Sequence, residues 1–407
     1  MTTDAPTDSA LLESFDAIRR EDLCRSQRIK WRRYGPDVLP AWVAEMDYPV
    51  ASPIRQSLAR LIERSDLGYH HLPLSPRLRA ALVVRMLDRF AWPIEPRRVL
   101  PLVNVVQGLD ASIVQHSRPG EGVMVQTPIY PPFLDAVTKS GRRLDACPLA
   151  PGDGRFEIDF DALRRSVRSD TRVLLLCHPH NPTGRVFDAD ELRGLAEFAL
   201  EHDLIVVSDE IHADLAFSEH PHRPFASLGP EIAERSITLT SASKAFNLPG
   251  LHCAFAIFGG DRAERPLRAL PPHLLGYPGI LADAATLAAW TEGQPWLDAV
   301  RATLRRNRAT LIGRLARDMP ELRMRAPEAT FLAWIDCRGL GLDDPQRFFL
   351  EHAKVALSDG REFGPPGAGY VRLNFATSAG ILDDILDRMA TAVRERPVFA
   401  GARRTRD

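Results

Sequence analysis

Lysine is nearly absent from this chain of 407 residues. Against forty-eight arginines it keeps four lysines, Lys30, Lys139, Lys244 and Lys354. Arginine cannot replace lysine where an amine must lose its proton and form a Schiff base, because a guanidinium stays charged. We expect Lys30, Lys139 and Lys354 to be ordinary exposed residues. Lys244 comes shortly after an apolar run and two serines, so we expect it to be a functional amine.

An excess of one charge and long apolar runs are also missing. The formal net charge is −1, which gives no overall attraction to nucleic acid or to an anionic membrane. No apolar run is long enough to span a bilayer, and the N-terminus has no signal-peptide core. The five cysteines contain no CxxC pair and suit a reducing compartment. We therefore expect a cytoplasmic protein without nucleic acid or membrane partners.

No zinc-site spacing of histidine or cysteine occurs, so we expect no metal.

Apolar runs typical of strands alternate with helical patterns through the middle of the chain. We expect strands at residues 123–126, 173–177, 204–207, 236–239 and 253–258. Helices are expected between them, for example at 190–202, and a further helix is expected to begin at Leu109, after the apolar run 103–106 and the pair Gln107-Gly108. This alternation predicts an α/β fold with a mostly parallel sheet covered on both faces.

The pattern changes after Pro278. Long helices are expected at 280–290 and 296–319, followed by strands at 330–335 and 370–375 and a final helix at 382–394. This predicts a smaller α+β domain. We expect residues 50–290 to form the large domain and residues 291–400 the small one, to which the segment 11–49 also belongs. Residues 1–10 and 401–407 are polar and are expected to be disordered.

Four chemically distinct side chains follow expected strands: Tyr130, Asn181, Asp209 and Lys244. Ligands of such sheets bind at the carboxyl ends of the strands, so one site can hold all four. Pyridoxal phosphate needs a lysine amine, a carboxylate at its pyridine nitrogen, a donor to its phenolic oxygen and an aromatic face. The four residues therefore suggest a pyridoxal phosphate site. Taken alone, Asp209 would be interpreted as a helix N-cap; with Lys244 thirty-five residues later, we favour the site.

The phosphate of this cofactor needs backbone N–H groups at a helix start together with hydroxyl groups. Gln107, Gly108 and Leu109 open an expected helix, and Ser241 and Ser243 precede the lysine. We expect these five residues to bind the phosphate, although a glycine at such a position is often only a turn residue.

Two further segments are candidates for the substrate side of the site. Arg372 alternates with apolar residues in an expected strand, and its bidentate fork matches a carboxylate. The apolar segment 39–49 carries two acids, Glu45 and Asp47. Acids are uncommon inside such a run, although a loop that packs its aromatic residues would explain them. We expect side chains from Ala44 onwards in this segment to line the substrate pocket.

Four motifs resemble the class I/II aminotransferase fold of pyridoxal phosphate enzymes, in order and in spacing. They are Asn181-Pro-Thr-Gly184, Ser208-Asp209-Glu-Ile-His212, Ser241-Ala-Ser-Lys244 and Tyr370-Val-Arg372-Leu-Asn374. The resemblance runs from about Trp42 to about Met389. Within this family, Trp42-Val-Ala-Glu-Met-Asp47, Gly68-Tyr69, Lys244-Ala-Phe-Asn-Leu-Pro-Gly-Leu251 and Glu328-Ala-Thr-Phe-Leu-Ala-Trp334 are similar to the cystathionine β-lyase branch, also called the MalY/PatB or C–S lyase branch.

The resemblance implies a role for each candidate. Lys244 would form the Schiff base and then move the Cα proton, and Asp209 would pair with the pyridine nitrogen. Asn181 would bond the phenolic oxygen, Tyr130 would stack on the ring, and Arg372 would bind the substrate α-carboxylate.

The resemblance also implies a homodimer with composite sites, because Tyr69 would reach the phosphate in the neighbouring subunit. Two positions depart from the pattern of many aminotransferases. His212 stands where those enzymes tend to have tyrosine near the pyridine-binding aspartate, and His252 stands where they often have a phosphate-binding arginine. Both changes suit the lyase branch, although His252 taken alone could equally be a core histidine in a strand.

Together these observations predict a pyridoxal phosphate-dependent carbon–sulfur β-lyase. Its substrate would be L-cystathionine or a related cysteine S-conjugate, and its products would be a thiol, pyruvate and ammonia. An aminotransferase on the same fold is the first alternative, because a fold does not fix a reaction. A regulatory or protein-binding role on the retained fold is the second.

Overall fold

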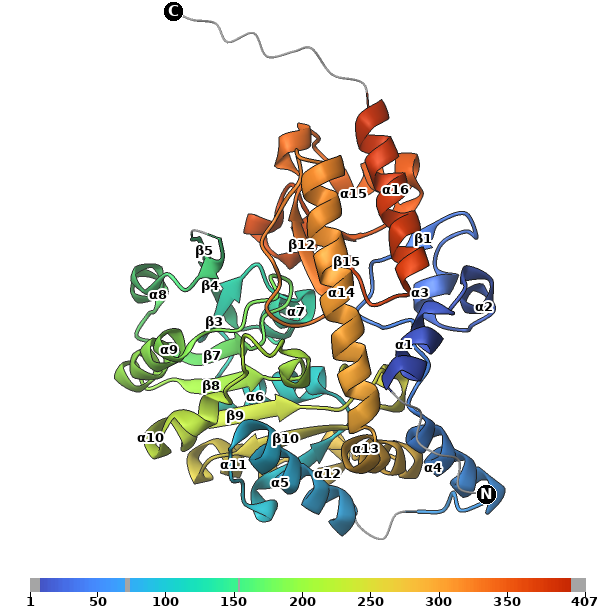
Figure 1. Ribbon diagram of the computed structural model, residues 1–407. Coiled ribbons are helices and arrows are strands. Elements are labelled where there is room, and N and C mark those ends of the chain that lie inside the picture. The colour runs from blue at the N-terminus through green and yellow to red at the C-terminus, as the bar shows by residue number, and fades with distance from the viewer. Residues whose placement is uncertain (1–7, 70–73, 153, 397–407) are drawn as a thin grey trace, which may run out of the picture.

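The computed structural model describes residues 8–69, 74–152 and 154–396. Its largest sheet has seven strands in the order β2-β10-β9-β8-β7-β3-β4 (Figure 1). The bounds are β2 (Val99–Leu102), β3 (Gly122–Thr127), β4 (Arg143–Pro148), β7 (Thr171–Cys177), β8 (Ile205–Asp209), β9 (Ser236–Thr240) and β10 (Ala254–Phe258). Strands β4, β3, β7, β8 and β9 pair in parallel, whereas β10 is antiparallel to both of its neighbours. The predicted α/β fold with a mostly parallel sheet is confirmed.

Helices cover both faces of this sheet, which explains the near-continuous apolar runs of its strands. Val123 and Val125 of β3 lie in the core under α6 (Val105–His116), α7 (Pro131–Lys139) and α11 (Asp261–Arg268). Met124, between them, faces the core under α8 (Phe160–Ser166) and α9 (Ala189–Glu201). On that second face, β10 packs against α5 (Pro76–Phe90) and α13 (Ile280–Glu292), the latter also contacting α4 (Ser52–Glu63).

A second sheet follows in the C-terminal part of the chain, in the order β11-β12-β15-β14. Its strands are β11 (Arg323–Met324), β12 (Leu332–Asp336), β14 (Ser358–Asp359) and β15 (Tyr370–Asn374), all antiparallel to their neighbours. The long helix α14 (Gln294–Asp318) runs from the base of the molecule to this sheet, beside α16 (Ala379–Glu395) (Figure 1).

The N-terminal segment packs on this C-terminal part. β1 (Leu39–Pro40) pairs in parallel with β13 (Val355–Ala356), and α1 (Asp8–Asp16) contacts α14. We propose that residues 11–49 and 291–400 together form the small domain and residues 50–290 the large one, and these contacts support that division. In the part of the chain that the structure describes, no helix has the length and apolar character that crossing a bilayer requires.

Two expected boundaries were wrong. The helix expected to begin at Leu109 begins at Val105, because the side chain of Asn104 caps it by accepting the Gln107 N–H at 2.9 Å. The apolar run 103–106 is therefore the end of a turn and the first helical residues. At the N-terminus, α1 begins at Asp8, so residues 8–10 are helical rather than disordered. The tail 401–407 lies outside the described residues.

The prediction that Lys30 is an ordinary exposed residue was also wrong. Its side chain is 1% exposed, and its Nζ lies 2.8 Å from Oδ2 of Asp47, whose side chain is equally buried. Lys139 and Lys354 are exposed as expected. Composition indicated that the lysines are rare, but not that one of them has a buried acid seventeen residues away.

The turn after Asn181 joins the two parts of the chain through Gly184. This residue has a φ of +73°, and a Cβ placed on it would lie 2.4 Å from Cβ of Pro327. The Gly184 carbonyl accepts the N–H groups of Glu328 and Ala329 at 2.8 and 3.0 Å. The turn therefore docks on residues 327–329 so closely that a side chain at position 184 does not fit.

We predict that Gly184→Ala lowers the free energy of unfolding by roughly 2 kcal/mol, because it combines an unfavourable backbone conformation with a clash. Gly313→Ala is the matched control. Gly313 lies inside α14 with nothing near its absent side chain, so alanine there is expected to stabilise by roughly 0.5–1 kcal/mol. Thermal unfolding of both variants measures this, and a Gly184→Ala midpoint at or above the wild-type value would contradict the argument.

Candidate active site

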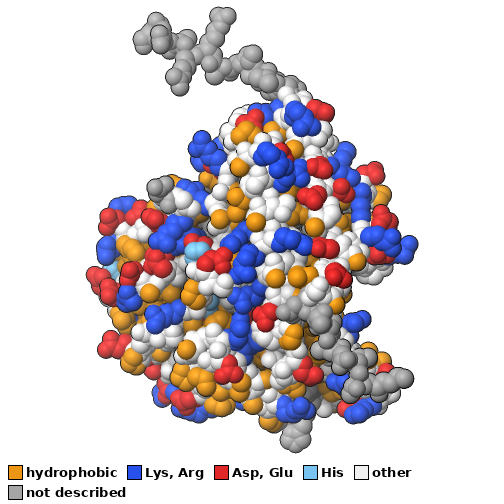
Figure 2. Space-filling model, in the orientation of Figure 1, with side chains coloured by type: hydrophobic (Ala, Val, Ile, Leu, Met, Phe, Trp, Pro, Cys, Tyr) orange, Lys and Arg blue, Asp and Glu red, His pale blue; other side chains and the backbone are white. Residues whose placement is uncertain are grey.

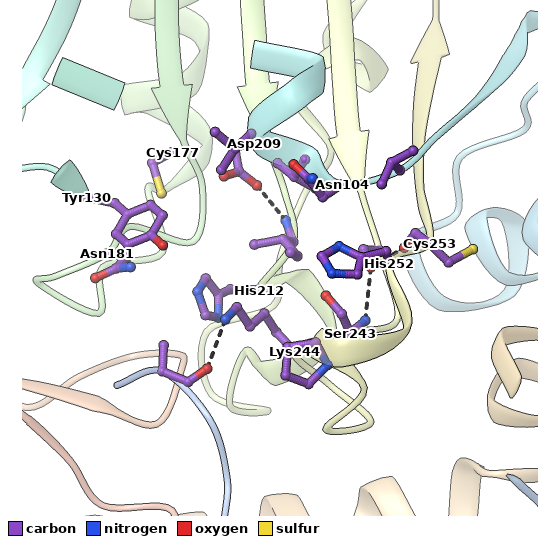
Figure 3. Close-up of a pocket in the computed structure, with 17 residues that line it drawn as sticks. Asn104, Tyr130, Cys177, Asn181, Asp209, His212, Ser243, Lys244, His252 and Cys253 are labelled. Atoms are coloured by element: carbon purple, nitrogen blue, oxygen red, sulfur yellow. Dashed lines mark hydrogen bonds between the residues drawn. The ribbon is translucent and has the colours of Figure 1, made fainter. Parts of the chain in front are cut away.

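A pocket opens at the carboxyl ends of β7, β8 and β9 (Figure 3). It is lined by side chains from both sheets' neighbouring loops and is open to solvent on one side. The structure brings to its wall most of the predicted site residues: Ala44, Tyr130, Asn181, Asp209, His212, Ser241, Ser243, Lys244 and His252. These residues come from six separate stretches of the sequence, and the parallel strands align most of them at one edge.

Lys244 projects into this pocket from the turn after β9. Its Nζ donates a hydrogen bond to the carbonyl oxygen of Ala44 at 2.8 Å. Burial and the positive charge of Arg372 together lower the pKa of this amine to about 8, against the attraction of Asp209 and Glu45. An amine with such a pKa gives up its proton near neutral pH, as a nucleophile or base must.

Asp209 lies at the end of β8 and is 5% exposed. Burial raises the pKa of this carboxyl to about 7, although Oδ1 accepts the Ile211 N–H at 3.0 Å and Lys244 attracts the charge. The alternative role of helix N-cap is not what the structure shows, because the next helical turn begins only at Ala213, with His212 at the cap position. The carboxyl is therefore free to pair with a cationic or N–H group bound in the pocket.

Arg372 lies in β15 and reaches the edge of the same pocket through Asn181. One of its Nη atoms donates to Oδ1 of Asn181 at 3.0 Å, and the other donates to the Trp42 carbonyl at 2.9 Å. Because Oδ1 of Asn181 is engaged in this way, its amide N–H groups remain as the donors that it can offer to a ligand.

The guanidinium of Arg372 is buried without a counter-ion. The residue is 5% exposed, and among the described residues no carboxylate forms an ion pair with it. Burial lowers the pKa of Arg372 to about 10. Other buried arginines are paired: Arg185 binds Glu328 at 2.8 Å and Arg85 binds Asp214 at 2.7 Å. An unpaired buried cation is costly, so this position suits an anionic ligand such as a carboxylate.

The opposite wall of the pocket is the first turn of α6. Val105 and Val106 line it, and as the first helical residues they have no N–H acceptor within the helix. The structure thus differs from the expectation for Gln107, Gly108 and Leu109, none of which lines the pocket. The side chain of Gln107 instead bonds the backbone at Val103 and Leu274.

Gly108 and Leu109 have a packing role in place of the expected phosphate contact. A Cβ on Gly108 would lie 2.8 Å from side-chain atoms of both Leu102 and Leu239, so this glycine lets α6 approach the sheet closely. Leu109 belongs to the core under the same helix. The missed signal was Asn104, whose residue type is typical of the N-cap that sets where the helix begins.

The two serines before the lysine differ from each other. The Ser241 hydroxyl donates to the Cys253 carbonyl at 2.6 Å and accepts the Ser243 N–H at 3.0 Å, so it shapes the turn. Ser243 lines the pocket beside it. His252 also lines the pocket, in a left-handed conformation with a φ of +55° and before β10 begins at Ala254. It is exposed, so the alternative of a core histidine in a strand is not what the structure shows.

Three aromatic candidates lie in different surroundings. Tyr130 lines the pocket at the start of α7, and burial raises the pKa of its hydroxyl. His212 is 2% exposed, and burial with the nearby cations lowers its pKa to about 3, so it is neutral. Tyr69 is fully exposed and does not line the pocket of its own chain.

These surroundings suit pyridoxal phosphate. The amine of Lys244 lies at the centre, the buried Asp209 carboxyl needs an N–H or cationic partner, and the free N–H groups of α6 with Ser243 form a cradle for an anion. Pocket residues that the sequence did not single out are Val103, Asn104, Val105, Val106, Cys177, Ile211, Pro249 and Cys253. Among the described residues no group of three or more histidine, cysteine or acidic side chains is placed to hold a metal ion.

Known proteins resemble the whole of this arrangement. The family described as Aminotransferase class I and II matches residues 38–389. The cystathionine beta-lyase PatB of Bacillus subtilis is 36% identical over 391 residues, which cover 93% of this chain and 100% of PatB. The crystal structure of OvoB matches with a TM-score of 0.89 at 37% identity, covering 94% of this chain and 99% of OvoB. The PLP-bound C-S lyase from Staphylococcus hominis matches with a TM-score of 0.87 at 29% identity, covering 94% of this chain and 99% of that one.

The raised pKa of Asp209 predicts a pH-dependent cost in the cofactor-free protein. Ordinary aspartate has a pKa near 3.8, and here folding raises it to about 7. Between about pH 4 and about pH 7 the Asp209 carboxyl is protonated in the folded chain but ionised in the unfolded chain. The free energy of unfolding therefore falls as the pH rises from about 4, and the full loss is reached above about 7. We expect cofactor-free Asp209→Asn to unfold about 2 °C or more above wild type at pH 8. The difference should shrink towards pH 4.

Pyridoxal phosphate should reverse this order, because only the wild-type carboxylate can pair with the pyridine nitrogen. Differential scanning fluorimetry across pH, with and without the cofactor, measures both effects. If cofactor-free Asp209→Asn were less stable than wild type at pH 8, this prediction would be wrong, because groups of the protein itself would then compensate the buried Asp209 carboxylate without the cofactor.

Proposed function

The chain belongs to the class I and II aminotransferase family, and we propose that it is a pyridoxal phosphate-dependent carbon–sulfur β-lyase. Its substrate would be L-cystathionine or a related cysteine S-conjugate. The observation that supports an amino-acid substrate is that Arg372 is buried without a counter-ion in the part of the chain that the structure describes. Arg372 is hydrogen-bonded to Asn181, which lines the same pocket as Lys244. PatB is named a cystathionine beta-lyase and the Staphylococcus hominis protein a C-S lyase, which supports elimination over transamination.

Different residues of the pocket would hold different parts of the cofactor. Lys244 would bond its aldehyde carbon and Asp209 its pyridine nitrogen, while the amide N–H groups of Asn181 would donate to the phenolic oxygen. Val105, Val106 and Ser243 would hold the phosphate. When bound, the cofactor supplies an electron sink for the pair released from the Cα–H bond of the substrate.

The substrate would be held and deprotonated by the chain's own residues. Arg372 would bind the α-carboxylate with its fork, in place of the water that burial has removed. Lys244 would take the Cα proton, since its pKa of about 8 makes a neutral amine readily available. The bond from Cβ to sulfur would then break with its electron pair on sulfur, and the thiol would leave. Water would convert the remaining three-carbon fragment to pyruvate and ammonia.

The reaction is tested by its products. We expect L-cystathionine to give equal amounts of thiol and pyruvate, and an amino acid with 2-oxoglutarate to give little glutamate. Lys244→Ala should bind the cofactor without a covalent bond and make no pyruvate above background, because no other amine reaches the pocket among the described residues. Lys139→Ala, at an exposed position, is the control and should match wild type. Glutamate without thiol would instead support the aminotransferase, and normal turnover by Lys244→Ala would exclude the proposed mechanism.

We further propose a homodimer with composite sites, in which Tyr69 reaches the phosphate bound by a second subunit. Tyr69 is fully exposed. Ile62 and Leu67, which precede it in the chain, are also exposed, as are Leu274 on α12 (Pro272–Leu275) and Tyr277 just after that helix. Exposed apolar side chains of this size favour an interface. The five cysteines are all unpaired, which supports the cytoplasmic location that we also propose.

Mixing two inactive variants tests the composite site. Lys244→Ala lacks the amine, and Tyr69→Ala lacks the residue that the partner needs. If they reassociate at random, half of the dimers contain both chains, and each mixed dimer has one intact site, so about a quarter of wild-type activity should return. Light scattering checks the dimer. No recovery in a mixture shown to contain mixed dimers would place Tyr69 in the site of its own subunit or outside the site.

A further inference from the structure

Residues 41–48, which we call the strap, contribute Ala44 to the pocket wall and offer backbone carbonyls to Lys244 and Arg372. The Ala44 carbonyl accepts from Nζ of Lys244 at 2.8 Å. The Trp42 carbonyl accepts from Nη of Arg372 at 2.9 Å and from the Ser358 hydroxyl at 2.6 Å. The position of the strap therefore decides where the amine and the guanidinium point.

Two asparagines bind the strap, and each belongs to a segment that carries one of these cations. Asn374, two residues after Arg372, donates to the Val43 and Glu45 carbonyls at 2.7 Å each. Asn247, three residues after Lys244, donates to the Met46 and Tyr48 carbonyls at 2.9 Å each. Each asparagine therefore links the strap to the segment that carries one of the two cations.

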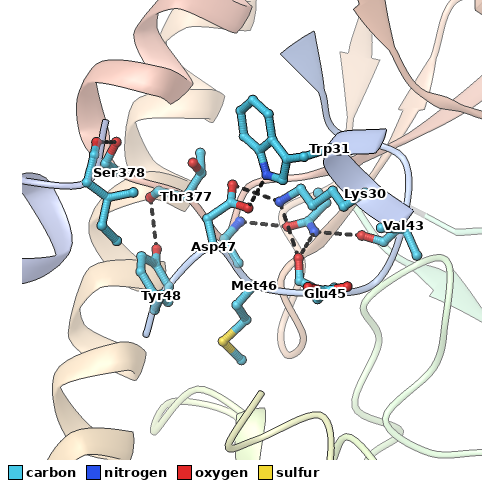
Figure 4. A network of polar contacts seen from close by, with 12 residues as sticks. Lys30, Trp31, Val43, Glu45, Met46, Asp47, Tyr48, Thr377 and Ser378 are labelled. Carbon is cyan, nitrogen blue, oxygen red and sulfur yellow. Dashed lines mark hydrogen bonds and ion pairs between the residues drawn. The ribbon is translucent and has the colours of Figure 1, made fainter. Parts of the chain in front are cut away.

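On the outer side the strap is held by α3 (Ile29–Arg32), through Lys30 and Trp31 (Figure 4). Nζ of Lys30 donates to Oδ2 of Asp47 at 2.8 Å and to the Glu45 carbonyl at 3.3 Å. Nε1 of Trp31 donates to the other carboxylate oxygen of Asp47 at 2.7 Å. The indole of Trp42 returns the contact by donating to the Lys30 carbonyl at 3.3 Å.

This ion pair is a costly way to hold a loop. The side chains of Lys30 and Asp47 are each 1% exposed, and taking both charges out of water offsets most of their attraction. An apolar pair would fill the space, but it would not fix the direction of a backbone carbonyl. The ammonium of Lys30 is a compact donor that bonds the Asp47 side chain and the Glu45 carbonyl of the strap at once.

We infer that Lys30 is a positioning residue of this active site. By binding Asp47 and the Glu45 carbonyl from outside, it holds the strap so that the Ala44 carbonyl faces Lys244 and the Trp42 carbonyl faces Arg372. Lys30 itself does not line the pocket. The inference deepens the proposed function and rests on it for its effect on turnover, whereas the placement of Lys244 can be tested without turnover.

The test variant is Lys30→Met/Asp47→Asn, which removes both charges and leaves neither partner buried alone. The charged and titratable groups near Lys244, which are Glu45, Asp209, His212 and Arg372, stay in place. The control is Arg98→Met/Glu264→Gln. This second pair is also largely buried, but Arg98 lies just before β2 begins and Glu264 lies in α11, and neither lines the pocket.

The first measurement needs no cofactor. Cofactor-free full-length chains are acetylated with acetic anhydride at one pH, and peptide mass spectrometry follows each lysine. The exposed Lys139 and Lys354 serve as internal standards. We expect Lys244 to react at least about threefold faster, relative to these standards, in the test variant than in wild type, because the Ala44 carbonyl no longer holds its ammonium form. The control should react as wild type does.

The second measurement uses the enzyme loaded with cofactor. With L-cystathionine we expect KM to rise and kcat to fall, each by about tenfold in the test variant, since Arg372 and Lys244 both lose a backbone acceptor. The control should keep both constants. If wild type releases no thiol, the proposed function fails while the labelling result still decides the role of Lys30.

The outcomes separate positioning from mere stabilisation. Faster labelling of Lys244 in a folded test variant with an unchanged control supports the inference. A folded test variant with wild-type labelling and wild-type kinetic constants overturns it, and Lys30 then only stabilises the fold. If the test variant does not fold, Trp31→Phe replaces it, because that change removes one bond to Asp47 and keeps the ion pair. The same labelling criterion then applies with a smaller expected effect, and unchanged labelling again overturns the inference.

Discussion

The site depends on burying charge that the protein itself does not fully neutralise. Lys244, Asp209 and Arg372 surround one pocket, and burial shifts the pKa of each towards its neutral form. Asp209 and Arg372 are buried and Lys244 is half-buried, while the partners that the chain offers them are mostly neutral amide and carbonyl groups. Such an arrangement stores free energy that a ligand of the complementary charge pattern releases on binding. A pyridinium, a phosphate and an amino-acid carboxylate have that pattern.

Several other buried charges of the chain are paired. Arg185 binds Glu328 and Glu191, and Lys30 binds Asp47. These pairs lie where segments from different parts of the chain must meet, so they fix the position of one segment against another. The same chemistry therefore has two uses here. Paired buried charges fix one segment of the backbone against another, whereas the charged groups of the pocket, which lack an ionic partner among the described residues, are available to bind a ligand.

Both parts of the chain contribute to the chemistry. The seven-stranded sheet supplies Asp209, Asn181 and Lys244 at the ends of parallel strands. The four-stranded sheet supplies Arg372, and the strap lies between them with carbonyls bonded to each side. A small shift of the strap would move the amine and the guanidinium together, which is why contacts outside the pocket influence the groups inside it.

The sequence by itself determined the α/β fold and five of the seven strands of the large sheet to within a few residues, because buried strands leave local apolar patterns. The strands β2 and β4 were not predicted. The sequence also singled out Tyr130, Asn181, Asp209 and Lys244, which follow or end strands and which the structure brings to one pocket. It misplaced the start of α6 by four residues, and with it the backbone groups that face the pocket. Only the tertiary structure decided that Lys30 is buried against Asp47, that Arg372 has no counter-ion, and that Ala44 meets Lys244. These contacts join residues from 17 to 200 positions apart. Burial and charge pairing at such separations are set by how the chain packs, and no local pattern records them.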